Sequence, residues 1–216
     1  MKLCVLDAWH PDDPALVTSH WFAEKTVIAL RRAFPDDGIQ FVSGDEVDRA
    51  RVSVELQQEH QGFAYFGHGS ERRLSRHGAV LVGVEEVRFL RDRWFHAFAC
   101  LSGDTLCHDA AEAGAAAYLG YKTIVNVHWE VLRLPEALSE RLEVLVTVAT
   151  LQLAHGERSR RAIRSSVRQA SLRLIEWLDM NEEACSSIPW YELTGLKVLA
   201  VTLHRDLELE GIAVLD

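Results

Sequence analysis

Short apolar runs alternate with segments of helical spacing along this 216-residue chain, and this alternation limits the folds open to it. Most of these runs lack the in-and-out polarity of a half-exposed strand, which is typical of strands buried on both faces. We assign strands to residues 3–6, 39–42, 63–66, 94–99 and 114–121. Buried strands that alternate with helices form a mostly parallel sheet with helices on both faces. We therefore predict a three-layer α/β/α sandwich in a single domain, residues 1–216.

The segments between and after these strands complete the expected order of elements. Residues 17–33 and 136–154 have helical spacing, and 157–178 places Ile163, Val167, Ala170, Leu174 and Leu178 on one face. We expect residues 71–78 to form a polar loop and 79–84 a small hairpin or edge strand. Residues 124–127 should extend the strand before them or turn back. Residues 196–203 and 207–214 are interpreted as a closing pair of strands.

Composition excludes several classes of function. The chain has 32 acidic residues against 23 Lys and Arg, a formal charge of -9, which disfavours nucleic acid as a partner. No apolar stretch approaches the roughly 20 residues of a membrane span, so we expect no membrane partner. The four cysteines form no CxxC pair, and reduced thiols in the cytoplasm are their simplest explanation.

Two polar residues follow neighbouring apolar strands at the point where each strand ends. His68 lies in a Gly-His-Gly turn after the third strand, and Cys100 ends the fourth, 32 positions later. In open α/β sheets, ligands bind beyond the carboxyl ends of the strands. His68 and Cys100 are therefore expected to face one crevice.

This pair has the chemistry of a nucleophile and its acid–base partner. A cysteine thiol is mostly protonated at neutral pH and needs activation, which a neighbouring imidazole supplies. A helix that begins near Asp104 adds a positive dipole potential close to the sulfur. Gly69 lets the backbone approach a substrate, so its N–H and that of Cys100 could form an oxyanion hole. Taken singly, a Cys at a strand end is usually a small buried hydrophobe, and only the joint placement favours catalysis.

The same segments resemble the caspase-like cysteine peptidases. Tyr65-Phe66-Gly67-His68-Gly69-Ser70 and Phe98-Ala99-Cys100-Leu101-Ser102-Gly103 look like the His-Gly and Ala-Cys motifs of this superfamily, which includes caspases, gingipains, clostripain, separase and CHAT domains. Residues 110–120 and 154–170 are similar to segments that follow the nucleophile in CHAT and gingipain-like domains, the nearest members. The resemblance implies a caspase-like fold and a bacterial peptidase that needs no cofactor. It makes His68 the general acid/base, Cys100 the nucleophile, and Gly69 with Cys100 the oxyanion donors.

Other polar residues have weaker patterns. Cys107 and His108, together with the pair above, lack the spacing of a zinc site, and Ser70 and Ser102 lie in no G-x-S-x-G elbow. We therefore predict no metal. Asp7 closes the first strand, which in this superfamily lies beside the His-bearing strand, so it either lines the substrate pocket and favours Arg or Lys before the scissile bond or simply caps a turn. Arg160, Arg164 and Arg168 form a basic stripe that is either a solvated face or a docking face.

These observations predict a cysteine endopeptidase that cleaves a protein or peptide substrate through an acyl-enzyme. The chain shows no pro-segment, calcium-loop signature or recognition module, so we expect the site to be gated either by its own loops, such as residues 70–78, or by a partner protein, which either activates it or is its target. The alternative is a caspase-like scaffold or binding protein without activity. The reactivity of Cys100 toward iodoacetamide, compared with that of Cys107, separates the two hypotheses.

Overall fold

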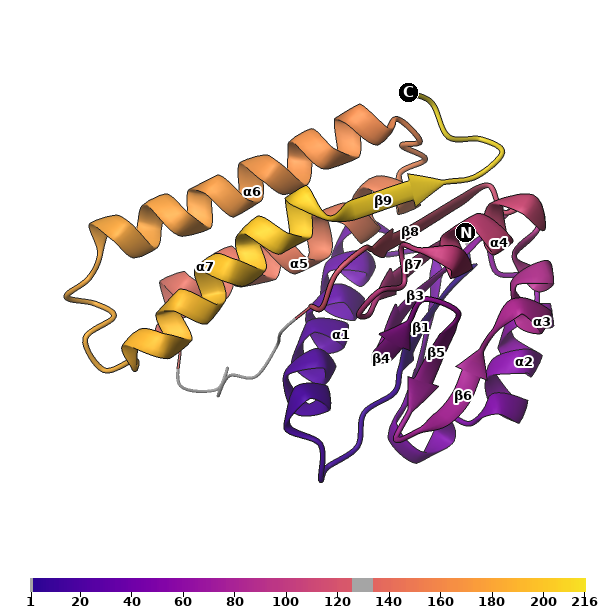
Figure 1. Ribbon diagram of the computed structural model, residues 1–216, viewed down its shortest axis with the longest axis horizontal. Coiled ribbons are helices and arrows are strands. Elements are labelled where there is room, and N and C mark those ends of the chain that lie inside the picture. Colours follow the sequence, from indigo (N-terminus) through magenta and orange to yellow (C-terminus); the bar gives the residue numbers. More distant parts are fainter. Residues whose placement is uncertain (1, 126–133) are drawn as a thin grey trace.

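The computed structural model describes residues 2–125 and 134–216, and a six-stranded sheet forms the centre of this described part (Figure 1). Its strands are β1 (Lys2–Asp7), β2 (Gly38–Ser43), β3 (Gly62–Phe66), β7 (Trp94–Phe98), β8 (Ala117–Tyr121) and β9 (Leu207–Glu210), in the order β2-β1-β3-β7-β8-β9. All neighbours pair in parallel except β9, which runs antiparallel to β8. The predicted mostly parallel sheet is confirmed.

Helices cover both faces of this sheet (Figure 1). One face packs against α1 (Pro14–Ala33), α5 (Glu136–Ala154), α6 (Arg160–Met180) and α7 (Trp190–Arg205). The other packs against α2 (Arg49–Gln57), α3 (Val84–Val87) and α4 (Thr105–Glu112). Alternate side chains of β1 enter the two cores, Leu3 and Val5 on one face, Cys4 and Leu6 on the other. The sheet is therefore the middle layer of an α/β/α sandwich, as predicted.

A small antiparallel sheet follows the third strand and forms one side of the site described below. It consists of β4 (His68–Ser70), β5 (Arg73–Arg76) and β6 (Ala79–Val82). The prediction of a loop at 71–78 was wrong, because Leu74 is fully buried and anchors a central strand despite its polar neighbours. The tight turn after β5 uses positive φ angles at His77 and Gly78. Two 3₁₀ turns, at Gly44–Glu46 and Arg88–Leu90, complete the elements on this side.

The C-terminal part differs from the predicted pair of strands. Residues 196–203 belong to helix α7, whose buried Leu196, Leu199, Ala200 and Leu203 have the i, i+3, i+4, i+7 spacing of one helical face. Only β9 in the second predicted segment is a strand. Part of the segment expected to continue or reverse β8, residues 126–127, lies outside the described residues. Within the described ranges, no helix combines the length and apolar character needed to cross a bilayer.

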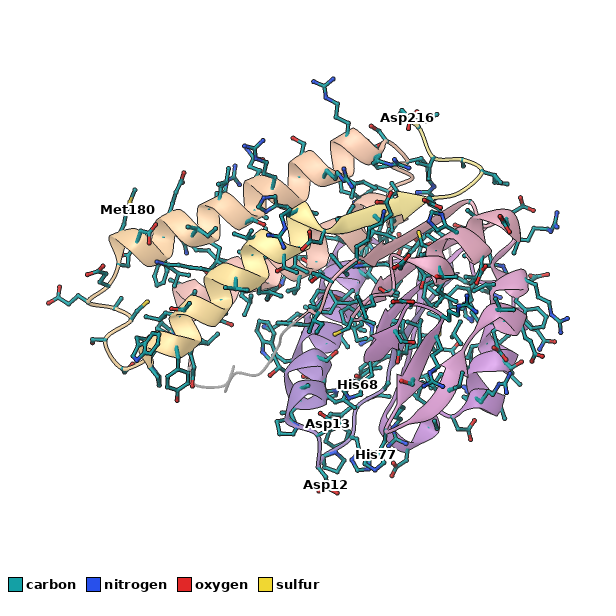
Figure 2. The ribbon with its side chains drawn as sticks, viewed as in Figure 1. Asp12, Asp13, His68, His77, Met180 and Asp216 are labelled. Atoms are coloured by element: carbon teal, nitrogen blue, oxygen red, sulfur yellow. The ribbon has the colours of Figure 1, made fainter. Side chains whose placement is uncertain are left out.

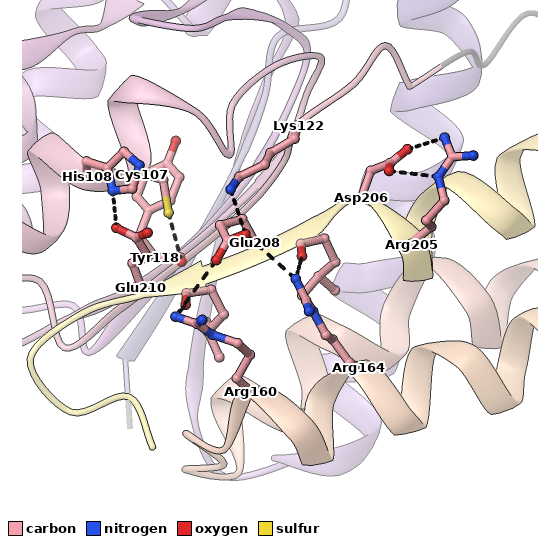
Figure 3. Close-up of polar contacts among 12 residues, drawn as sticks. Cys107, His108, Tyr118, Lys122, Arg160, Arg164, Arg205, Asp206, Glu208 and Glu210 are labelled. Atoms are coloured by element: carbon pink, nitrogen blue, oxygen red, sulfur yellow. Dashed lines mark hydrogen bonds and ion pairs between the residues drawn. The ribbon is translucent and has the colours of Figure 1, made fainter. Parts of the chain in front are cut away.

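The last strand is held by the basic stripe on α6 (Figure 3). The guanidinium groups of Arg160 and Arg164 donate to the outer carbonyls of β9, Leu209 O at 2.9 Å and Leu207 O at 2.6 Å. Between them, the nearly buried carboxylate of Glu208 lies 3.0 Å from Lys122 Nζ and within 3.8 Å of both arginines. Two of the three arginines in the stripe therefore anchor the sheet edge, and they are more than a solvated face.

Candidate active site

His68 and Cys100 lie side by side because of the sheet register. β3 and β7 are adjacent and parallel, with Phe66 opposite Phe98, and each of the two candidate residues follows its strand by two positions. Both side chains border one cavity of about 220 Å³. The cavity is lined by Ala15, Leu16, Ser19, Gly67, His68, Phe98, Ala99, Cys100, Ile124 and Val125. The structure thus brings together the two residues that the strand pattern singled out.

A carboxylate from the start of α1 binds the imidazole (Figure 2). Asp13 Oδ2 lies 2.6 Å from His68 Nε2, and Asp13 is also the N-cap of α1, accepting from the N–H of Ala15 at 3.1 Å. Partial burial would raise the pKa of the Asp13 carboxyl, but the hydrogen bond and charge of His68, with bonds from backbone N–H groups, hold that pKa below its ordinary value. Asp13 therefore holds Nε2 of the His68 ring and fixes the orientation of the imidazole.

Sequence reasoning missed Asp13 as a site residue. An Asp directly before Pro14 at the start of an apolar helical segment is a strong N-cap signal, and that signal predicts the end of a helix rather than a contact with residue 68. The contact spans 55 positions and depends on how α1 packs against the sheet. Nothing local in the sequence specifies that packing.

Cys100 rests as a thiol. Its Sγ contacts the carbonyl oxygen of Val125 at 3.7 Å, and in the described part of the chain no hydrogen bond joins it to His68. Burial raises the pKa of the Cys100 thiol, while the contact with Val125 lowers it by less. The raised pKa favours the protonated form of the sulfur over the thiolate.

The backbone around the sulfur is tightly packed and strained. A Cβ at Gly69 would lie 2.5 Å from the carbonyl oxygen of Cys100 and 2.8 Å from Ala99 Cβ, so only glycine allows β4 to pass this close. Leu101, the residue after Cys100, has φ +53°, a left-handed conformation that costs a Leu roughly 1–2 kcal/mol. Strain of this kind is concentrated at functional sites, where the fold over-determines it.

Ser102 stabilises the backbone turn that follows β7 and carries Cys100. Its hydroxyl is fully buried and contacts the carbonyl oxygens of Ala97 at 3.0 Å and Ala99 at 2.8 Å. These bonds hold the end of β7 against the following residues. They also occupy the Ser102 hydroxyl, so this serine supports the position of Cys100 and has no role as a nucleophile.

A zinc site would need Cys107 and His108 to lie beside His68 and Cys100, and the structure keeps these two pairs apart. Cys107 is buried in α4 and contacts the carbonyl of Tyr118, whereas His108 is on the surface and pairs with Glu210 (Figure 3). Neither residue borders the cavity beside Cys100. Among the described residues, one buried group has metal-ligand composition, Cys4 with Glu55 and His60, under α2. Its carboxylate is already bound by Arg51 and Gln40, which opposes the binding of a cation there.

Asp7 lies at the end of β1, one strand away from His68, as expected from the sequence, but its carboxylate is enclosed. Its side chain is 1% exposed and is held by Ser43 Oγ at 2.5 Å and His20 Nδ1 at 2.6 Å. The hydrogen bond that His20 donates to the Asp7 carboxylate raises the pKa of His20, partly opposed by burial. Asp7 is not among the residues that line the described cavity.

Comparison with known proteins gives matches among solved structures alone. No family model matches the chain, and no curated protein matches it. The Arg-specific cysteine proteinase gingipain R superposes with a TM-score of 0.55 at 14% identity, over 97% of this chain and 45% of the other. A complex of the pro- and mature domains of Porphyromonas gingivalis RgpB gives a TM-score of 0.57 at 14% identity, over 98% of this chain and 47% of the other.

The chain thus spans less than half the length of the structures it matches. At this level of identity the similarity concerns the fold, and it agrees with the strand order and the layers described above. The prediction of a caspase-like architecture is confirmed. The protein has the caspase-like α/β fold that gingipain R adopts.

Proposed function

We propose that this protein is a cysteine peptidase in which Cys100 is the nucleophile, His68 the general acid/base and Asp13 the group that orients His68. The observation that carries the proposal is their convergence: His68 and Cys100 border one cavity at the carboxyl ends of adjacent parallel strands, and Asp13 holds His68 at 2.6 Å. A thiol, an imidazole and an orienting carboxylate are the components of nucleophilic acyl transfer.

The raised pKa of the thiol determines the order of events in this mechanism. A peptide carbonyl binds in the cavity, and His68 takes the proton of Cys100 as the sulfur attacks the carbonyl carbon. The N–H groups of Gly69 and Cys100 are proposed to bind the oxyanion that forms. The C–N bond then breaks and His68 gives its proton to the leaving amine. A water, deprotonated by His68, attacks the thioester and releases the carboxylate product and the free thiol.

Asp13 has a defined part in these steps. Its carboxylate fixes the ring orientation and favours the imidazolium that forms after His68 takes the proton. The other ring nitrogen then exchanges protons with the sulfur and the leaving amine. Because Asp13 is already held in place as the N-cap of α1, its carboxylate can stabilise the His68 imidazolium with little reorganisation.

We further propose that the substrate is a protein and that a partner controls access to the site. One of the matching structures, that of RgpB, is a complex of its pro- and mature domains, so a protein with this fold binds another protein domain there. On α6, Arg161 and Arg168 border an open hollow together with His204 and supply an exposed basic face where an acidic partner segment could bind. The rival hypothesis, an inactive scaffold, predicts neither turnover nor a reactive Cys100.

The test compares wild type with Cys100→Ala, His68→Ala and the matched control Cys107→Ala, on protein substrates and on a fluorogenic peptide library. We expect Cys100→Ala and His68→Ala to lose turnover by at least about 10³-fold while keeping the wild-type circular dichroism spectrum, and Cys107→Ala to keep most activity. Iodoacetamide should label Cys100 before the fully buried Cys107. Wild-type turnover by Cys100→Ala would refute the proposal, and absent turnover with unreactive Cys100 would favour the scaffold.

A further inference from the structure

Among the described residues, the walls of the cavity beside Cys100 carry almost no charge. Of its lining residues within the described chain, His68 and Cys100 are the two that can ionise; Asp13 already binds His68, and burial raises the pKa of the Cys100 thiol. Apart from the Ser19 hydroxyl, the remaining walls are apolar side chains and backbone, with Leu16, Phe98 and Ile124 contributing the largest apolar groups. A pocket with these walls stabilises an apolar side chain and penalises a charged one.

We infer that this cavity receives an uncharged, mainly apolar residue, such as Leu or Met, on the acyl side of the scissile bond. The inference rests on the proposed peptidase function and specifies its substrate class. It replaces the expectation of a basic residue that followed from Asp7, and it differs from the Arg specificity stated for the gingipain neighbour. Three observations support it: the enclosure of Asp7, the identity of Ser19 and the size of the cavity.

The first observation concerns the acid expected to bind a basic side chain. Asp7 already has two partners on Oδ2, the Ser43 hydroxyl and the His20 ring. Its second oxygen, Oδ1, has no hydrogen-bond partner among the described residues, but it is buried and lies outside the cavity lining. An Arg or Lys side chain in the cavity would therefore lose its hydration without meeting a carboxylate among the lining residues described.

The second observation is that the wall formed by α1 carries Ser19, a neutral residue, at a position where an acidic residue could bind a basic side chain. Ser19 lies one helical turn after Ala15 and Leu16, on the same face of α1, and all three line the cavity. Its hydroxyl is buried and has no hydrogen-bond partner among the described residues. The position thus keeps this wall of the cavity neutral.

The third observation is size. The cavity measures about 220 Å³, below the roughly 300–1,000 Å³ of pockets that enclose a whole small-molecule ligand. This volume suits one side chain of a peptide. Because an unpaired guanidinium or carboxylate is far more costly to bury than a butyl or thioether group, we expect peptides with Leu or Met to exceed those with Arg, Lys or Asp by about 100-fold in kcat/KM.

The first experiment is a panel of fluorogenic peptides that differ only in the residue before the scissile bond, with Leu, Met, Ala, Gln, Arg, Lys and Asp. Wild type should cleave the Leu and Met peptides fastest. Preference for Arg, Lys or Asp would overturn the inference and leave the proposed peptidase function standing. If no peptide is cleaved, the same panel is bound to Cys100→Ala and measured by calorimetry. Tighter binding of Leu than of Arg is then expected, and equal, reversed or absent binding overturns the inference.

The second experiment changes the wall itself. Ser19→Asp adds a carboxylate to the cavity, and Ser19→Asn is its neutral control of matched shape. We expect Ser19→Asp to raise the Arg-to-Leu ratio at least about tenfold above that of Ser19→Asn, in cleavage or in binding. Equal ratios in two variants with wild-type circular dichroism spectra would show that Ser19 is a packing residue without influence on specificity. If Ser19→Asp does not fold, Ser19→Glu is read against Ser19→Gln in the same way.

Discussion

Asp13 has two structural tasks that a pair of substitutions can separate. It caps α1 through the N–H of Ala15, and it binds His68 Nε2. Asn is about as good an N-cap as Asp, so Asp13→Asn keeps the cap and removes the charge that orients the imidazolium. Asp13→Ala removes both. The two variants should therefore agree in activity and differ in stability.

The structure sets the sizes of both effects. Loss of the cap costs about 1 kcal/mol, which lowers the Tm of a chain of this length by about 2–4 °C in Asp13→Ala, with little change in Asp13→Asn. A buried orienting Asp changed to Asn costs a serine protease about 10⁴-fold in kcat. The Asp13 side chain is 24% exposed, so we expect a smaller loss, about 10²- to 10³-fold, in both variants.

The assay is kcat on the best peptide together with thermal unfolding. The reasoning is refuted if Asp13→Asn keeps wild-type kcat. It is also refuted if activity follows Tm, because Asp13 would then act through the helix cap alone.

Two histidines should give stability a measurable pH dependence. Because Asp7 raises the pKa of His20, the stability from that pair is complete below about pH 6.5 and is lost as the pH rises through the raised value. His20→Gln should therefore flatten the fall in Tm above pH 6.5, and a slope equal to that of wild type would contradict the assignment. Burial lowers the pKa of His96 to about 3, so protonation of the unfolded chain should remove about 2 kcal/mol of stability between pH 7.5 and pH 5. The free energy of unfolding of His96→Gln, measured in urea, should not fall between these two pH values. A fall as large as that of wild type would contradict the assignment to His96.

The part of the site that could be predicted is the part fixed by sheet geometry. His68 and Cys100 end buried strands, and parallel neighbours present their carboxyl ends at one edge. A local pattern was therefore enough to bring together two residues 32 positions apart. Asp13, Ser19 and the enclosure of Asp7 depend on the packing of α1 against the sheet, and no spacing rule encodes that packing.

The errors in the predicted fold have a related cause. Residues 196–203 contain an apolar run that suits a buried strand or a buried helix, and its contact with α6 decides in favour of a helix. β5 is read as a loop because Arg73, Ser75 and Arg76 surround its single buried anchor, Leu74. In both places tertiary contacts outweighed the local signal.

The strained turn after Cys100 gives a way to test the choice between enzyme and scaffold. A scaffold gains nothing from a Leu at φ +53°, whereas a nucleophile benefits when its backbone is held in one conformation. Glycine adopts this φ without penalty, and Ala removes the Leu side chain but keeps the penalty. Leu101→Gly should therefore be more stable than Leu101→Ala by up to about 1 kcal/mol, after allowance for the greater freedom of Gly in the unfolded chain.

Activity should move in the opposite direction to stability. With Gly at position 101, the Cys100 carbonyl loses the restraint that holds it against Gly69, so kcat should fall about tenfold below that of Leu101→Ala. Chemical denaturation and peptide turnover of the two variants decide the question. Equal stabilities would show that no strain is stored at residue 101. A Gly variant that is more stable and as active as the Ala variant would show that the strain does not serve catalysis, because relaxing the turn would then cost the reaction nothing.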